Sequence, residues 1–274
     1  MKTFRAAWPL LVLVTLGAAL LAALGFAPSR PKDVQFSAYA TPLEGRTRNQ
    51  KRNARLAAAC LDGKIVRPGE VFSFNHAVQS WTQDAGFVKA PVSFDGELVR
   101  AYGGGVCQTS TTLYNAALLA GVPVLERHPH NFRPRYAVPG RDAAVAFPGI
   151  DLRFRNPYPW PLHLKAEASG GLLRISLWGR EKLARSPRIE TVLLDTMRPQ
   201  RLTRIARTVR DEAGRPQSGG KAFGRSAGTV GYRTATYRLT RTAQGWKREK
   251  LSDDTYPAMN RVVALTEDEV IEQP

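Results

Sequence analysis

The sequence contains little cysteine and little histidine. Its 274 residues include two cysteines and four histidines, so at most one intramolecular disulfide, between Cys60 and Cys107, can form. The Cys-x-x-Cys and His-Glu-x-x-His spacings that mark common zinc sites are missing. We therefore expect no metal or other cofactor, and zinc held by His128 and His130 with Cys107 or His76 is the alternative.

Acidic residues are also scarce. The chain has 23 Asp and Glu against 40 Lys and Arg, which gives a net charge of +17 and a pI of about 10.4. Such an excess of positive charge indicates an anionic partner, which can be nucleic acid, lipid headgroups or an anionic cell-wall polymer.

Only one long hydrophobic run is present, at residues 10–27. It follows the basic residues Lys2 and Arg5 and is just long enough to span a bilayer. Because positive residues stay on the cytoplasmic side, the rest of the chain is expected to be exported. We favour a membrane anchor at residues 1–27 with a tether at 28–33, and a cleaved signal peptide, hence a secreted protein, is the alternative. An exported protein does not meet genomic DNA, so we exclude nucleic acid and expect an anionic membrane surface or wall polymer.

The rest of the chain is organised around residues 102–121, where three glycines precede a helical pattern. Leu113, Ala116 and Ala120 recur at spacings of three and four, which predicts a buried helix. Cys107 lies at its start, where the helix dipole and unpaired N–H groups favour a thiolate. A reactive thiol is one interpretation, and a disulfide with Cys60 or an inert core cysteine are the others.

A thiol nucleophile needs a base that takes its proton and a third group that orients the base. His128 and His130 follow Cys107 in a proline-containing loop, and Asp142 lies in a later turn. In extended backbone, residues two apart point the same way, so either histidine can face the thiol. The predicted catalytic residues are Cys107, His130 or His128, and Asp142.

Residues beside the thiol are expected to bind substrate. The glycine run offers backbone groups that no side chain covers, and the helix start offers polar side chains. The expected substrate-binding residues are Gly103, Gly104, Gly105, Gln108, Thr109 and Ser110.

Alternation of apolar and polar residues predicts strands on both sides of this helix. Strands are expected at 34–40, 64–66, 71–74, 122–126, 143–147, 151–155, 162–164 and 173–177, extended backbone at 136–138, and a second helix at 49–60. The pattern predicts an α+β domain over residues 34–180, in which an antiparallel sheet packs on the buried helix.

A small, basic and mainly β region is expected at residues 181–274. Residues 231–251 alternate like a hairpin, and residues 261–265 form one more apolar run. Between them and the first domain, arginines recur every three residues, which gives a basic amphipathic stripe if the segment is helical. The expected anion-binding residues are Arg198, Arg201, Arg204, Arg207 and Arg210. A solvated charged face is the alternative.

Several long motifs resemble those of the VanW-like proteins, a family named after an accessory protein of a vancomycin-resistance operon. The motifs lie at residues 68–75, 103–121, 126–130, 140–143 and 151–156. Asn131 stands where the family pattern has a serine after the histidine that corresponds to His130. Residues 224–228 and the hairpin after them faintly resemble the G5 module that follows this domain in some members.

The resemblance implies an exported, envelope-associated protein linked to peptidoglycan, and it supplies no mechanism. Together with the residues above, it leads us to expect a membrane-anchored cysteine hydrolase or acyl transferase that acts on peptide or amide bonds of peptidoglycan or its precursors. Helix N–H groups would stabilise the oxyanion. The alternative from a different class is a non-catalytic module that binds cell wall or a lipid-linked precursor.

Overall fold

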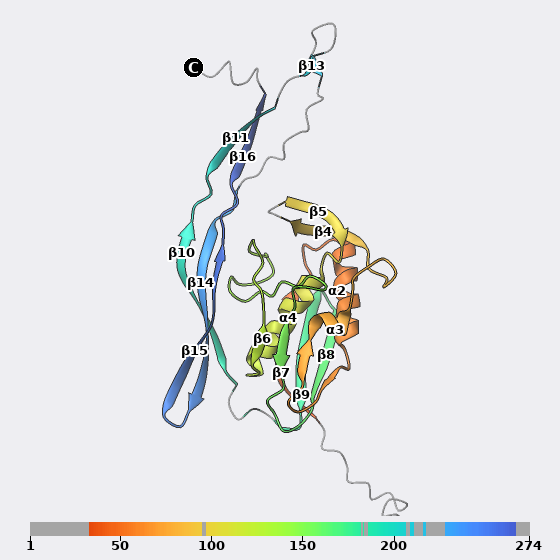
Figure 1. The fold of residues 1–274 in the computed structure, drawn as a ribbon, viewed down its shortest axis with the longest axis vertical. Coiled ribbons are helices and arrows are strands. Elements are labelled where there is room, and N and C mark those ends of the chain that lie inside the picture. Colours follow the sequence, from red (N-terminus) through yellow and green to blue (C-terminus); the bar gives the residue numbers. More distant parts are fainter. Residues whose placement is uncertain are drawn as a thin grey trace, which may run out of the picture. The chain divides into compact units, whose positions relative to one another are not determined.

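One helix, α4 (Val106–Leu119), lies at the centre of the fold, with other elements packed around it (Figure 1). The structure is a computed structural model that describes residues 33–94, 97–181, 183, 186–206, 209–210, 216–217 and 228–266. The predicted anchor at residues 1–27, all of the tether except residue 33, Arg207, and all of the motif at 224–228 except its last residue lie outside this range. Within the described residues, no helix has both the length and the apolar character that crossing a membrane requires.

Strands make up most of the regular structure. In chain order the elements are β1 (Val34–Pro42), α2 (Arg48–Leu61), β2 (Ile65–Val66), β3 (Val71–Ser73), α3 (Phe74–Val78), β4 (Lys89–Phe94), β5 (Glu97–Tyr102), α4, β6 (Val124–Glu126), β7 (Arg153–Arg155), β8 (Leu162–Ser169), β9 (Leu172–Gly179), β10 (Arg188–Met197), β11 (Arg201–Ala206), β12 (Val209–Arg210), β13 (Pro216–Gln217), β14 (Gly231–Thr242), β15 (Gly245–Tyr256) and β16 (Arg261–Thr266).

The main sheet is antiparallel and has the strand order β1-β9-β8-β2. Helix α4 packs on β1 and β9, and α2 packs on β8 and on α4. A second antiparallel sheet has the order β3-β7-β6, and β4 pairs with β5 as a hairpin. This arrangement confirms the predicted α+β fold with an antiparallel sheet on a buried helix.

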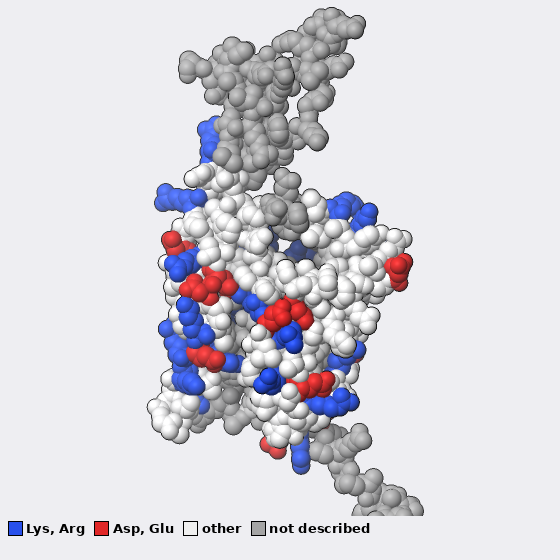
Figure 2. All heavy atoms as spheres, in the orientation of Figure 1, with Lys and Arg blue, Asp and Glu red and all other residues white. Residues whose placement is uncertain are grey.

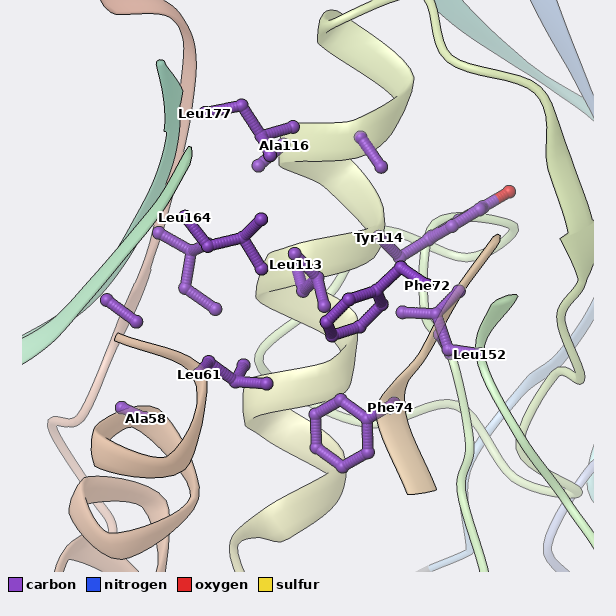
Figure 3. Packing of buried hydrophobic residues seen from close by; sticks show 14 of the residues in the cluster. Ala58, Leu61, Phe72, Phe74, Leu113, Tyr114, Ala116, Leu152, Leu164 and Leu177 are labelled. Carbon is purple, nitrogen blue, oxygen red and sulfur yellow. The ribbon is translucent and has the colours of Figure 1, made fainter. Parts of the chain in front are cut away.

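The core forms on several sides of α4 (Figure 3). Leu113 and Ala116 of α4 meet Leu164 and Leu177 of the main sheet, and all four are fully buried. On another side of the same helix, α4 faces three further buried side chains, Phe72, Phe74 and Leu152. A helix that is apolar on most sides is buried on most sides, as its sequence predicted.

Helix α2 begins where its sequence supplies a cap. The Thr47 side chain accepts a hydrogen bond from the Gln50 N–H at 3.2 Å, and the Gln50 side chain accepts one from the Thr47 N–H at 3.1 Å. This capping box satisfies two N–H groups that have no partner inside the helix. It also fixes the turn at residues 43–47, which precedes the helix.

Three of the C-terminal strands form a separate sheet in the order β10-β14-β15, and the predicted hairpin is its strands β14 and β15, with β14 in the middle. The prediction that arginines at every third residue form a basic amphipathic helix is wrong. Residues 201–206 form strand β11, which pairs in parallel with β16 over its whole length, so the backbone hydrogen bonds go to another strand. Because a strand repeats every two residues, a spacing of three does not gather one face.

Three smaller predictions are also wrong. Residues 136–138 lie in a turn region, and residues 143–147 make only isolated bridges. Residue 74 starts helix α3 because Ser73 caps it, accepting from the His76 N–H at 3.0 Å.

Charges on the C-terminal sheet are interleaved rather than of one sign. Arg238 of β14 pairs with Glu249 of β15 at 3.0 Å, and Arg248 of β15 pairs with Glu190 of β10 at 3.1 Å, so the ion pairs link β15 to its neighbour β14 and, across β14, to β10. Figure 2 shows basic and acidic atoms side by side on this face. The positive excess of the chain is therefore not concentrated in one patch over β14 and β15.

Candidate functional site

Cys107 lies in the first turn of α4, directly after the glycine run. Gly105 is the N-cap of the helix and adopts a left-handed conformation with φ of 112°. The thiol is partly buried, and its Sγ donates to the Val145 carbonyl at 3.4 Å. Cys107 and Cys60 are both free, which excludes the disulfide interpretation.

His130 connects the thiol to a carboxylate. Its Nδ1 lies 2.6 Å from Asp142 Oδ2, which leaves Nε2 on the side of the ring away from the carboxylate, and the imidazole and the Cys107 thiol are close enough to shift each other's pKa. Burial lowers the pKa of His130, but hydrogen bonds with Asp142 and Cys107 outweigh burial and raise the pKa to about 10. Burial alone would raise the pKa of Cys107. The interaction with the His130 imidazole and its positive charge lower this pKa by more, so the net pKa is lowered. The pair therefore favours thiolate and imidazolium.

Asp142 is fully buried and surrounded by donors. Besides the His130 ring, it accepts from the His130 N–H at 2.8 Å, from Arg127 Nη2 at 3.1 Å and from the Tyr256 hydroxyl at 2.5 Å. Burial raises its pKa, while His130, Arg127 and Tyr256 lower it more, so the net pKa is lowered. Asp142 therefore stays ionised and fixes the orientation of the imidazole.

Two residues of this network come from the C-terminal hairpin. The Tyr256 hydroxyl also accepts from the Gly140 N–H at 2.8 Å, and Asp254 pairs with Arg127 Nη1 at 2.6 Å. Sequence reasoning missed Arg127, Tyr256 and Asp254 as site residues. Arg127 lay in a recognised motif, but nothing in the local pattern around Tyr256 and Asp254 indicates a contact with a loop more than a hundred residues away.

Polar residues of α4 hold the Asp142 loop in place. The Ser110 hydroxyl donates to the Ala143 carbonyl at 2.6 Å, and Thr111 Oγ1 accepts from the Ala143 N–H at 3.0 Å. One turn later, the Asn115 amide makes two hydrogen bonds with Arg141. Its Nδ2 donates to the Arg141 carbonyl at 2.8 Å, and its Oδ1 accepts from Arg141 Nε at 2.7 Å. These bonds explain why a buried helix carries so many polar residues. They hold the loop that contains Asp142 against the helix that contains Cys107.

His128 lies elsewhere. Its ring Nε2 is 3.2 Å from Glu126, its side chain is 47% exposed, and its backbone bridges to Ala144. The structure therefore brings together Cys107, His130 and Asp142 and leaves His128 outside this group. Among the described residues, no group of His, Cys, Asp or Glu is arranged to hold a metal ion.

The residues expected to bind substrate are engaged in packing. A Cβ on Gly103, Gly104 or Gly105 would lie 2.1 Å from Trp81, 2.7 Å from the Pro91 carbonyl or 2.4 Å from the Gln50 carbonyl, respectively. Gln108 donates to the Thr41 hydroxyl and to the Pro42 carbonyl, and the Thr109 hydroxyl donates to the Ala54 carbonyl. Their contacts with neighbouring elements fix the position of Cys107.

The arrangement can perform nucleophilic chemistry. A thiolate at a helix start, an imidazolium beside it and a buried carboxylate behind the ring are the three groups that thiol acyl transfer requires. Of the first three N–H groups of α4, those of Val106 and Gln108 donate to the Gly103 and Gly105 carbonyls at 2.9 and 3.2 Å, so the Cys107 N–H between them is the one that can face an oxyanion.

Comparisons with known proteins match the part of the chain that holds this site. Residues 49–178 match the family model described as "VanW like protein". The chain is 37% identical over 147 residues to "Uncharacterized protein YoaR" of Bacillus subtilis strain 168, an alignment that covers 54% of this chain and 48% of that protein. It is 31% identical over 113 residues to "Vancomycin B-type resistance protein VanW" of Enterococcus faecalis strain V583, and this alignment covers 39% of this chain and 41% of that protein. The chain thus spans less than half the length of these relatives, and no solved structure matches it.

Proposed function

Through residues 49–178 the chain belongs to the VanW-like family, and we propose that it is a cysteine-dependent hydrolase or acyl transferase that acts on peptide or amide bonds. The observation that carries this proposal is the position of His130, whose Nδ1 lies 2.6 Å from the buried Asp142 carboxylate and whose imidazole lowers the pKa of Cys107 at the start of α4. Each member lies where its chemistry requires: the thiol at a helix start, the imidazole between thiol and acid, and the acid buried.

In the proposed reaction, the Cys107 thiolate attacks the substrate carbonyl carbon, and its electron pair forms the S–C bond. The Cys107 N–H at the start of α4 binds the oxyanion. When the C–N bond breaks, the His130 imidazolium gives its proton to the leaving nitrogen, which departs as an amine and leaves a thioester. Water or an acceptor amine then attacks the thioester, His130 takes the proton of that nucleophile, and the thiolate leaves.

We propose the peptide part of peptidoglycan or its precursors as the substrate. One relative is named a vancomycin B-type resistance protein, and the predicted N-terminal anchor would place the domain outside the cytoplasm, at the cell membrane. The net charge of +17 supports association with an anionic membrane surface or wall polymer.

The pH dependence of alkylation tests the thiolate. An unperturbed thiol with a pKa near 8.5 loses roughly two orders of magnitude in rate between pH 8 and pH 6. Because His130 stabilises the thiolate and keeps its own proton up to a pH of about 10, we expect the rate of Cys107 with iodoacetamide to fall only about threefold or less over this interval. The rate is measured by mass spectrometry of the Cys107 peptide.

His130→Ala should restore the steep profile of an ordinary thiol. His128→Ala is the matched control, since that ring pairs with Glu126, and it should leave the profile flat. A steep profile in the unmodified protein, unchanged by His130→Ala, would contradict the proposed nucleophile.

Covalent trapping tests the reaction class. When the protein is mixed with purified peptidoglycan fragments, we expect an acyl adduct on Cys107, or a released or exchanged peptide product, and we expect Cys107→Ala to abolish both. Binding of the fragments that survives Cys107→Ala, with no product from the unmodified protein, would support a non-catalytic binding module instead.

A further inference from the structure

An arginine that the mechanism does not use lies next to the reactive pair. The guanidinium of Arg46 stacks over the Tyr136 ring, with its Cζ 4.6 Å from the ring centroid. The Tyr136 hydroxyl is 3.5 Å from Nε2 of His130, the ring nitrogen that does not bond to Asp142. The two rings also meet edge to face, with centroids 6.4 Å apart. Arg46 is therefore one side chain away from the catalytic imidazole.

The position of Arg46 is fixed relative to Cys107. Its backbone N–H donates to the Leu43 carbonyl at 3.3 Å, in the turn that leads into the capped start of α2. The same segment contacts the start of α4. The Gln50 carbonyl lies so near Gly105 that a Cβ there would be 2.4 Å from its oxygen, and the Pro42 carbonyl accepts a hydrogen bond from the Gln108 side chain. This turn and the thiol are thus held by one set of contacts.

Within the described residues, Arg46 has no acidic partner and no side-chain hydrogen bond. The two carboxylates of the site, Asp142 and Asp254, both bond to Arg127. Arg46 is half-buried, so its positive charge is only partly hydrated. An arginine stacked by its face on an aromatic ring keeps its N–H edge available, and that edge fits a carboxylate with two parallel hydrogen bonds.

We propose that Arg46 binds a carboxylate of the substrate while Cys107 attacks a carbonyl close to it. The substrate class is then a peptide whose reacting bond lies near a free carboxylate, on a chain end or on a side chain. Tyr136 supports the guanidinium from below and keeps it beside the imidazole. This inference deepens the proposed function and rests on Cys107 being the reacting group.

Two alkylating reagents of almost equal size test the site without a known substrate. Iodoacetate carries a carboxylate and iodoacetamide carries a neutral amide, so the ratio of their rates at Cys107 reports attraction of a carboxylate to the site. We expect Arg46→Gln to lower the ratio of the iodoacetate rate to the iodoacetamide rate by about fivefold or more, with the iodoacetamide rate changed less than about twofold. Arg46→Lys, which keeps the charge but loses the planar edge, should retain part of the ratio.

Arg133→Gln is the matched control. Arg133 is an exposed arginine of the same loop as Tyr136, and it stacks on Tyr232 with its Cζ 5.4 Å from that ring. This substitution removes one positive charge but should leave the ratio unchanged. A ratio unaffected by Arg46→Gln, or lowered equally by Arg133→Gln, would overturn the carboxylate site and leave the nucleophile standing. Slow alkylation of Cys107 by both reagents would overturn the proposed function and this inference with it.

Discussion

Asp142→Ala is expected to lower the free energy of unfolding by about 3–5 kcal/mol, as loss of one partner does in buried ion pairs. The carboxylate is fully buried and accepts from His130, Arg127 and Tyr256, so its removal leaves several buried donors without an acceptor. The same substitution removes one of the two groups that raise the pKa of His130. Alkylation of Cys107 at pH 6 should therefore slow toward the rate of an ordinary thiol. Chemical denaturation and the alkylation assay measure the two effects.

Asp151→Ala separates these effects. Asp151 is also buried, and it accepts from the Ser73 hydroxyl at 2.5 Å and from the Asn75 N–H at 2.8 Å, but it bonds to neither Cys107 nor His130. It should destabilise the protein while leaving the pH profile of Cys107 flat. Equal loss of thiol reactivity in both variants would mean that Asp142 acts only through general stability.

The stability effect of Asp142 should depend on pH in a defined direction. Its pKa in the folded protein is lowered from an unfolded value of about 3.9. A carboxylate of this kind contributes stability above its unfolded pKa and loses that contribution as the pH falls through its folded pKa. The difference between the unmodified protein and Asp142→Ala should be largest near neutral pH and should shrink in acid.

Gly105→Ala is expected to cost roughly 2–6 kcal/mol, the sum of backbone strain and overpacking. Gly105 has φ of 112°, which side chains rarely adopt, and its Cβ would lie 2.4 Å from the Gln50 carbonyl oxygen. Backbone cannot move aside as a flexible side chain can, so α2 and α4 must separate at the turn that bears Cys107. Denaturation gives the cost, and slower alkylation of Cys107 should accompany it.

Gly69→Ala is the matched control, because Gly69 has φ of +77° and nothing within 4 Å of its Cβ position. It should cost only about 1–2 kcal/mol, the strain of the left-handed backbone, and it should leave thiol reactivity intact. If both variants cost the same, close packing would not be the reason for glycine at position 105. The prediction that the glycine run binds substrate would then regain support.

The sequence by itself determined the elements whose pattern is local. The apolar spacing after the glycine run predicted α4, and the same stretch placed Cys107 at its start, where a thiolate is favoured. Alternation predicted the strands of the main sheet and the C-terminal hairpin. Helical and extended periodicities show within a few residues which face is buried, so these features need no knowledge of distant partners.

Only the tertiary structure decided which residues meet the thiol. Alternation treated His128 and His130 as equivalent, yet one ring bonds to Glu126 and the other to Asp142. Tyr256 reaches Asp142 from 114 residues further along the chain. The arginine-rich segment became a strand because β16 offered its backbone a partner. Each choice depends on long-range hydrogen bonds and packing, which no local periodicity encodes, since they exist only once distant segments of the chain have come together.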